Sequence, residues 1–167
     1  MADKVAQWEG KYLRLVTDGG WEFVERVGGM TAVVIVAVHE GQYILVEQTR
    51  VPLGSRRCIE LPAGLVGDED ELGIEATALK ELEEETGFIA ERVERLGEFF
   101  SSPGMVAEGY TLVRAHGVRP GGAKSEVDID VHLVAPREVA TFIAVQRAKG
   151  LAIDTKILLL MAGELLS

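Results

Sequence analysis

The sequence KELEEETGF, residues 80–88, places four glutamates in a short segment that is followed by a helix-breaking glycine, Gly87. A helix turns by about 100° per residue, so side chains three and four positions apart share one face. By this geometry three of the carboxylates lie together: Glu81, Glu84 and Glu85. Glu83 falls on the opposite side, and Leu82 marks an apolar flank. We therefore predict a helix over 72–86 that packs one flank on a core and presents an acidic face beside it.

The acidic face is unfavourable for an isolated helix. Like charges at these spacings repel one another by about 0.2–0.5 kcal/mol per pair. The helix dipole also disfavours anions near the C-terminal end, where these carboxylates lie. Two interpretations remain at this point. The face could be an ordinary solvated surface, or it could bind a divalent cation such as Mg²⁺, a hard ion that prefers carboxylate oxygens.

The rest of the chain alternates strand-like segments with turns. Residues 31–38, TAVVIVAV, form a continuous apolar run that is typical of a strand buried on both faces. Further strands are expected at 11–16, 21–27, 43–50, 94–100, 110–115 and 129–134, and a short strand should run into a glycine-bearing loop within 55–67. Amphipathic helices are expected at about 136–148 and 154–166. This order predicts an α+β fold in which helices cover a mixed β-sheet.

Charge and composition exclude several classes of partner. The net charge of −10 argues against nucleic acid, because binding to a phosphate backbone requires lysine and arginine. No apolar stretch is long enough to span a bilayer, and the N-terminal MADKVAQWEG lacks the apolar segment of a secretory signal. The single cysteine, Cys58, cannot form an internal disulfide. We therefore expect a cytoplasmic protein with neither a nucleic-acid nor a membrane partner.

The segment from Gly64 to Phe88 resembles the signature of the Nudix family. The second half of that signature reads Arg-Glu-apolar-x-Glu-Glu-x-Gly-apolar, and residues 80–88 agree with it except that Lys80 replaces the arginine. A lysine lacks the bidentate fork with which an arginine holds carboxylates. The first half departs further, because Gly64 lies two positions early and the loop after it is longer. An isolated acidic position of the signature therefore has three candidates: Glu69, Asp70 and Glu71.

Other segments resemble the ADP-ribose pyrophosphatase branch of that family. They are WEFVER at 21–26, VEQTRVPLG at 46–54, ELPAGL at 60–65, SSPGMVAEG at 101–109 and DTKILLL at 154–160. The resemblance implies the Nudix fold, an α/β/α sandwich with a mixed sheet flanked by helices and an antiparallel β segment at the N-terminus. It also implies that residues 1–30 form that β segment, with roles in dimerisation and base contacts, and that 31–167 form the Nudix hydrolase domain.

A metal site at the acidic face is implied by the same resemblance. Mg²⁺ is the implied ion, with Mn²⁺ as a substitute. Glu81 and Glu85 are the implied ligands, and Glu84 is either a further ligand or a base beside them. The Ala63 carbonyl is another implied ligand, and Gly64 would let the backbone come close to the metal and the phosphate.

The general base is implied to come from an acidic loop after the signature. Glu126 is the first candidate and Asp128 the second, because the register of this branch is ambiguous there. Glu108, in the SPG loop, is a rival. Each of these carboxylates could instead be an ordinary surface charge.

Residues for the substrate follow from the resemblance as well. Trp21 would stack on the base, and Arg26 and Arg50 would hold phosphate or base, because arginine suits planar bidentate recognition. Gly64 and Gly104 would lie against the substrate. Taken alone, the tryptophan is more typical of a core or rim aromatic, and each arginine is equally typical of a surface ion pair.

The implied activity is Mg²⁺-dependent hydrolysis of the pyrophosphate bond of a nucleoside diphosphate sugar, with ADP-ribose giving AMP and ribose 5-phosphate. GDP-mannose or a UDP-sugar is the alternative substrate, because the signature binds metal and pyrophosphate and not the base. A non-catalytic module that senses a nucleotide sugar is an alternative of another class. The expected partners are therefore a small nucleotide sugar and a second copy of the chain, in a homodimer.

Overall fold

The computed structural model describes residues 4–67, 72–122 and 124–162. Its strands up to residue 66 are β1 (Val5–Glu9), β2 (Leu13–Asp18), β3 (Trp21–Arg26), β4 (Thr31–Val36), β5 (Val38–His39), β6 (Gln42–Arg50), β7 (Arg56–Glu60) and β8 (Ala63–Val66). The later strands are β9 (Phe88–Ile89), β10 (Arg92–Phe100), β11 (Gly109–His116), β12 (Arg119–Pro120), β13 (Asp130–Val134) and β14 (Ala152–Ile153). The α-helices are α1 (Ile74–Thr86) and α2 (Val139–Ala148), and the 3₁₀ helices are η1 (Val27–Gly29), η2 (Val51–Leu53), η3 (Pro136–Glu138) and η4 (Thr155–Met161).

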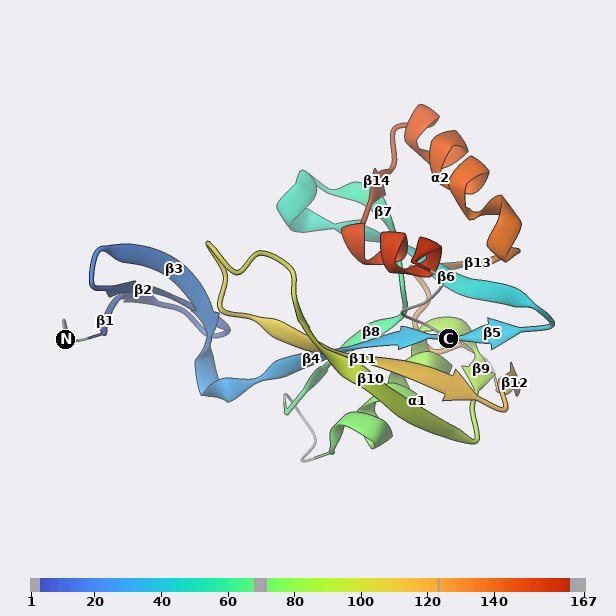
Figure 1. Ribbon diagram of the computed structural model, residues 1–167, viewed down its shortest axis with the longest axis horizontal. Helices are drawn as coiled ribbons and strands as arrows, with labels where there is room; N and C mark the ends of the chain where they lie inside the picture. Colours follow the sequence, from blue (N-terminus) through green and yellow to red (C-terminus); the bar gives the residue numbers. More distant parts are fainter. Residues whose placement is uncertain (1–3, 68–71, 123, 163–167) are drawn as a thin grey trace.

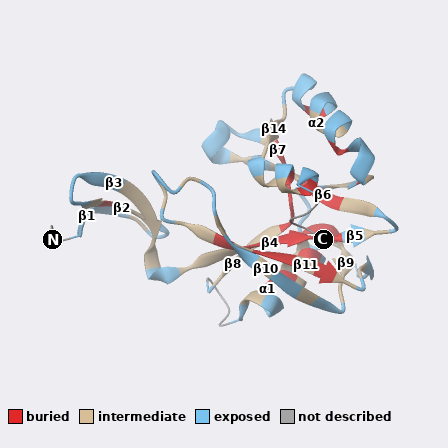
Figure 2. Ribbon diagram, in the orientation of Figure 1, coloured by how far each residue is buried: buried red, intermediate tan, exposed pale blue. Residues whose placement is uncertain are grey.

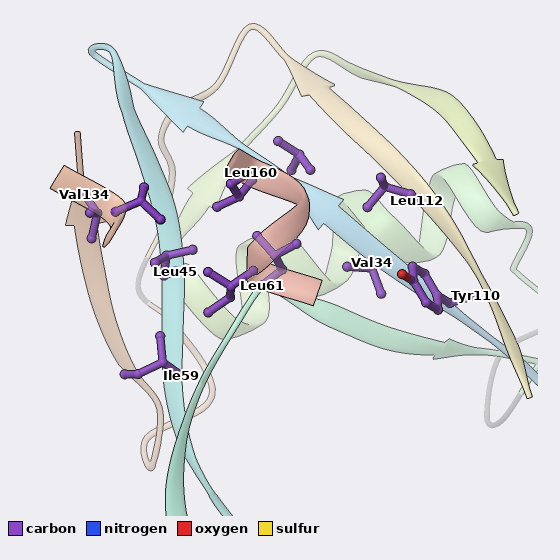
Figure 3. Close-up of a cluster of buried hydrophobic side chains, with 11 residues drawn as sticks. Val34, Leu45, Ile59, Leu61, Tyr110, Leu112, Val134 and Leu160 are labelled. Carbon is purple, nitrogen blue, oxygen red and sulfur yellow. The ribbon is translucent and has the colours of Figure 1, made fainter. Parts of the chain in front are cut away.

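A four-stranded mixed sheet in the order β10-β11-β4-β8 forms the centre of the molecule. β4 pairs parallel with β11 and antiparallel with β8. Alternate residues of β4 enter two separate apolar clusters, because successive side chains of a strand point to opposite faces. Val33 packs with Leu82 of α1 on one face, and Val34 packs with Leu112 in the cluster of Figure 3 on the other. The predicted strand with two buried faces is therefore confirmed (Figure 2).

A second mixed sheet lies on the opposite side of the centre from α1. Its strands run in the order β13-β6-β7-β14, and β14 pairs parallel with β7. The second apolar cluster joins this sheet to the first, because it contains Leu45 and Ile59 of this sheet together with Val34 (Figure 3). Figure 1 shows α2 and η4 on this side and α1 on the other. The layers confirm the predicted α+β sandwich of mixed sheet and helices.

The N-terminal strands form a sheet of their own, in the order β1-β2-β3, which projects to one side of the molecule (Figure 1). A loop of the main body is attached to it by main-chain hydrogen bonds. The amide of Val24 donates to the Met105 carbonyl at 3.0 Å, and the amide of Ala107 donates to the Val24 carbonyl at 2.8 Å. The loop that follows β10 thus extends the edge of the N-terminal sheet at β3.

Two expectations differ from the structure in their details. The C-terminal segment forms the 3₁₀ helix η4 and not an α-helix over the described part of 154–166. Asp154 caps it by accepting from the Lys156 amide at 2.8 Å, and the buried residues Ile157 and Leu160 share a face because three residues make one 3₁₀ turn. The glycine-bearing loop after residue 62 is in fact the strand β8, held by pairing with β4 despite its glycine.

Within the described ranges, no helix has the length and apolar character needed to cross a membrane.

Candidate active site

Strand β8 brings its backbone against the acidic face of α1. The amide of Ala63 donates to Glu85 Oε2 at 3.1 Å. A Cβ atom at Gly64 would lie 2.2 Å from the carboxyl carbon of Glu81, far inside any real contact distance. Because Gly64 has no side chain, the Glu81 carboxylate can lie directly against the backbone of β8 at this point. Two of the predicted metal ligands meet the predicted Ala63–Gly64 backbone in this way.

Burial disfavours the ionised forms of both carboxylates. Glu85 is only 6% exposed, and this burial raises its pKa to about 8 against the opposing effect of the Ala63 amide. The charge of Glu81 adds to the increase. Burial also raises the pKa of Glu81, and the neighbouring charge of Glu84 raises it further, while Lys80 lowers it. A cation bound between these groups would favour their ionised forms and so lower both pKa values.

The other residues of α1 lie as the helical geometry predicted. Glu83 is exposed, while Leu82 and Ala78 are fully buried against the central sheet. Gly87 ends the helix in a left-handed conformation, φ 75°, and its amide donates to the Glu83 carbonyl at 2.8 Å. The three candidates for the isolated acidic position of the signature, Glu69, Asp70 and Glu71, lie outside the described residues.

The donor chemistry of this site fits a hard divalent cation. Carboxylate oxygens and backbone carbonyls are the groups that Mg²⁺ and Mn²⁺ prefer. Desolvated carboxylates beside a glycine that leaves room for one of them are consistent with such an ion. In the described part of the chain, no three histidine, cysteine, aspartate or glutamate side chains are arranged to hold a metal by themselves. Backbone groups, water or substrate oxygens would have to complete the coordination.

The loop before β13 brings one candidate base to the acidic face. The amides of Ser125 and Glu126 both donate to the Glu84 carbonyl, at 3.1 and 3.0 Å. The charge of Glu126 contributes to the raised pKa of Glu81, so its carboxylate acts on that face. Asp128 instead lies beside Arg57 of β7, whose Nη1 donates to its carbonyl at 3.0 Å. Of the two candidate bases, Glu126 is thus associated with the acidic face and Asp128 with Arg57.

A pocket of about 570 Å³ lies next to the Ala63–Gly64 backbone. Its walls come from β4, β8 and β11 of the central sheet, from β6, β7 and β14 of the second sheet, and from β3 and η4. Apolar residues such as Val34, Leu53 and Ile153 form part of the wall, as does the Tyr110 ring. Arg50 connects the pocket to the acidic face, because its charge acts on Glu85.

The charged residues that line the pocket form three ion pairs. Arg50 binds Glu60 through two hydrogen bonds, of which Nε to Oε1 is 2.7 Å. Arg26 donates to Glu108, which joins the N-terminal sheet to the loop after β10. The third pair is Asp154 with Lys156, at 2.5 Å. Each described cation of the pocket wall therefore already has an anionic partner.

Two predicted substrate residues lie away from this pocket. Trp21 is 66% exposed at the tip of the β2–β3 hairpin, where it pairs with Asp18. Gly104 is exposed in the loop after β10, and a Cβ there would meet nothing within 4 Å. Neither lines the pocket, whereas Ser101 and Glu108 of the same loop do. Within one chain, the structure thus brings Arg26, Arg50 and Gly64 together without Trp21 or Gly104.

Sequence reasoning missed several residues of the pocket wall, including three with polar side chains. Glu60, Tyr110 and Lys156 were not among the candidate site residues. The Asp-x-Lys spacing at 154–156 is a signal of an N-terminal helix cap, which the structure contains. Glu60 begins the ELPAGL segment, but that segment gave it no role, and nothing local marked Tyr110, because each residue reaches the pocket through the pairing of its strand.

The fold and the acidic face agree with a comparison of the sequence with known families. A profile of the NUDIX domain matches residues 29–154, and the chain belongs to the Nudix family. A crystal structure of an ADP compounds hydrolase shares the fold, with a TM-score of 0.66 at 16% identity over 85% of this chain and 80% of that chain.

Curated relatives match parts of the chain. The ADP-ribose pyrophosphatase of Bacillus subtilis (strain 168) is 40% identical over 111 residues, 65% of this chain and 56% of the relative. The methanol dehydrogenase activator of Bacillus methanolicus is 40% identical over 88 residues, 52% of this chain and 46% of the relative. The ADP-sugar pyrophosphatase of Mus musculus is 46% identical over 68 residues, 41% of this chain and 30% of the relative. The chain thus matches about half or less of the length of these proteins.

Proposed function

We propose that the protein is a Nudix pyrophosphohydrolase that cleaves a nucleoside diphosphate sugar with the help of Mg²⁺. ADP-ribose, giving AMP and ribose 5-phosphate, is the first substrate to test. The observation that carries the proposal is the close approach of Gly64 to Glu81, with Glu85 buried beside it, at the edge of a pocket of about 570 Å³. The names of two of the relatives above support the choice of substrate class.

Attack by water on a pyrophosphate must overcome the negative charge of both phosphates. When bound, Mg²⁺ supplies neutralisation of that charge and a lower pKa for a water held against it. Glu81 and Glu85 would hold the ion, with Glu84 or the Ala63 carbonyl as further ligands. Glu85 is held in advance by the Ala63 amide, and positioning of this kind is a main source of catalysis in such sites.

The proton of the attacking water needs an acceptor near the acidic face. Glu126 is the carboxylate we assign to this role, because its loop is hydrogen-bonded to the Glu84 carbonyl. As the water oxygen bonds to phosphorus, the bond from phosphorus to the bridging oxygen breaks and that oxygen leaves with the second phosphate monoester. Glu108 is a weaker candidate because its carboxylate accepts from Arg26. Asp128 is weaker because its loop position is tied to Arg57.

The pocket beside the acidic face would hold the rest of the substrate. Arg26 and Arg50 have the guanidinium geometry that suits phosphate, yet each is paired with a glutamate. Of the two pairs, Arg26–Glu108 is the easier to exchange, because Glu60 of the other pair is almost fully buried. Arg26 is therefore the residue we expect to re-partner with a substrate phosphate.

A homodimer and a cytoplasmic location belong to the same proposal. Large apolar side chains are exposed on the N-terminal sheet and its first turn: Val5, Trp8, Tyr12, Leu13, Leu15 and Trp21. An exposed apolar group of this size is typical of an interface. A second copy docking there would give Trp21, which is remote from its own pocket, an opportunity to contact base. We therefore treat residues 1–30 as the dimerising segment and 31–167 as the hydrolase domain.

A coupled phosphate-release screen tests the proposed activity. ADP-ribose, GDP-mannose, UDP-glucose and diadenosine polyphosphates would each be incubated with Mg²⁺ and a phosphatase that acts only on the monoester products. We expect ADP-ribose to be cleaved by the wild-type chain and not by Glu85→Gln. A strong preference for GDP-mannose would overturn the choice of substrate. Binding of nucleotide sugars without any turnover would instead support the sensing alternative.

A further inference from the structure

Arg57 makes several hydrogen bonds to neighbouring strands of the second sheet, outside the pocket. Its Nε donates to Glu47 Oε1 at 2.8 Å, and its Nη2 donates to the Glu47 carbonyl at 3.0 Å on the neighbouring strand β6. The guanidinium then reaches past β6 to β13, where it binds the Asp130 carboxylate. His132 of β13 completes the group by contacting Glu47 Oε2 at 2.9 Å. The hydrogen bond to Glu47 holds the pKa of Arg57 above its ordinary value, and the charges of Glu47 and Asp130 add to the increase.

One contact of Arg57 leaves the sheet. Its Nη1 donates to the Asp128 carbonyl at 3.0 Å, in the loop that leads into β13. Asp128 follows Glu126 by two residues, and the side chain between them, Val127, is 85% exposed and contributes no packing. Ile129, next along the chain, is buried. Arg57 therefore fixes the C-terminal end of the loop at Asp128, the exposed residue directly before the buried Ile129.

The N-terminal side of the same loop is fixed on α1. The Ser125 and Glu126 amides share the Glu84 carbonyl, and the Gly121 amide donates to the Gly87 carbonyl at 2.8 Å. Glu126 thus lies between an attachment to the helix that carries the acidic face and an attachment to Arg57. Both ends must hold if the Glu126 carboxylate is to stay near Glu81.

We propose that Arg57 is a positioning residue that sets the Glu126 loop against the acidic face by holding the Asp128 carbonyl. The role of Glu126 as proton acceptor rests on the proposed function, whereas the attachment of the loop does not. Arginine is suited to the task because its planar fork reaches two strands and a loop at once, which lysine cannot do.

Arg57→Ala and Arg57→Lys test this role, with Arg56→Ala as the matched control. Arg56 is the preceding residue of β7, and it donates to the Gly150 carbonyl, between α2 and β14, and to no described residue of the Glu126 loop. Hydrogen exchange of the Ser125 and Glu126 amides measures the attachment without any substrate. We expect exchange to accelerate by about 10-fold in both Arg57 variants and to be unchanged in Arg56→Ala. Unchanged exchange in both folded Arg57 variants would overturn the proposal.

Kinetics test the consequence for Glu126. With Mg²⁺ and ADP-ribose, Arg57→Ala should lower kcat by about 10-fold and leave KM within about twofold, because Arg57 does not line the pocket. In a Glu126→Gln background the same change should lower kcat by less than about twofold, since the group it positions is gone. An equal decrease in both backgrounds would overturn the positioning role.

Asp130→Ala separates the loop contact from general support of the sheet. It removes the β13 contact of Arg57 and leaves the Asp128 carbonyl contact in place. We expect exchange and kcat close to wild type in this variant. Effects as large as those of Arg57→Ala would assign Arg57 to strand pairing and overturn the proposal. If the wild-type chain cleaves no nucleotide sugar, the proposed function fails, and the exchange measurement still decides whether Arg57 holds the loop.

Discussion

Replacing Gly64 with alanine should disable the site and leave the fold intact. The added Cβ would lie 2.2 Å from the carboxyl carbon, Cγ and Oε1 of Glu81, whereas real Cβ atoms essentially never come within 3.0 Å of such atoms. The Glu81 carboxylate would have to move by roughly 1 Å or more. A displacement of that size at a catalytic group costs about 10²-fold in rate.

The same substitution should cost little stability. Gly64 does not have the left-handed backbone conformation that would strain an alanine. Replacing glycine by alanine at a compatible position stabilises a chain by about 0.4–1 kcal/mol, chiefly by restricting the unfolded state. The partly exposed Glu81 side chain can turn toward solvent. We therefore expect the free energy of unfolding of the metal-free protein to change by less than about 1 kcal/mol.

Two assays and one control decide the matter. Calorimetric titration with Mg²⁺ or Mn²⁺ should show weakened binding in Gly64→Ala, and the coupled assay should show the loss of kcat. Gly73→Ala is the control, since a Cβ there meets only Glu75 Oε2 at 4.0 Å, and it should retain metal binding and turnover. A folded Gly64→Ala protein with wild-type metal affinity and kcat would refute the reasoning.

Three further predictions concern single charges. Burial raises the pKa of Glu85 to about 8 in the folded chain from 4.5, so the folded state binds more protons between these values. The metal-free protein should therefore lose stability as pH rises through this window. In EDTA, the melting temperature of Glu85→Gln should depend less on pH than that of the wild-type chain. Glu83→Gln should leave kcat within about twofold of wild type, since Glu83 is exposed, while Glu85→Gln lowers it by at least about 10²-fold. Arg50→Ala should lower the free energy of unfolding in urea by about 2 kcal/mol, because it leaves the buried Glu60 carboxylate without its bidentate partner, and adding Glu60→Gln should recover part of the loss.

Each of these outcomes has a result that contradicts it. A melting temperature in EDTA that rises between pH 4.5 and 8, and does so equally in Glu85→Gln, is incompatible with the buried carboxyl described above. Equal decreases in kcat in Glu83→Gln and Glu85→Gln would mean that the two faces of α1 do not differ in their role in turnover. Full stability of Arg50→Ala would show that Glu60 finds another partner.

The helix and its acidic face could be predicted because they depend on local periodicity. The position of each residue on α1 follows from 3.6 residues per turn, and the Gly87 end follows from the freedom of glycine to adopt a left-handed conformation. The buried strand β4 could equally be predicted from the unbroken apolar run at 31–38. These elements carry their own signals in a few adjacent residues.

The pocket could not be predicted in the same way, because its contacts join distant segments. Arg26 and Glu108 are 82 positions apart, and only the attachment of the loop after β10 to β3 brings them together. Arg57 reaches Asp128 across 71 positions because β6 lies between β7 and β13. The strand β8 was missed for a similar reason, since its pairing with β4 outweighs the low strand propensity of Gly64.

The hydrogen bonds between Val24 and the loop after β10 have a consequence for the modularity of the chain. The family profile begins at residue 29, yet the sheet edge completed by Met105 and Ala107 lies on both sides of that limit. In a chimera joined at residue 29, Val24 and the loop after β10 would come from different proteins, so the pairing between them would depend on a foreign sequence. The smallest unit that can be transplanted together with Glu108 therefore includes β3. The residues matched by the family profile are fewer than those that a functional chimera must keep together.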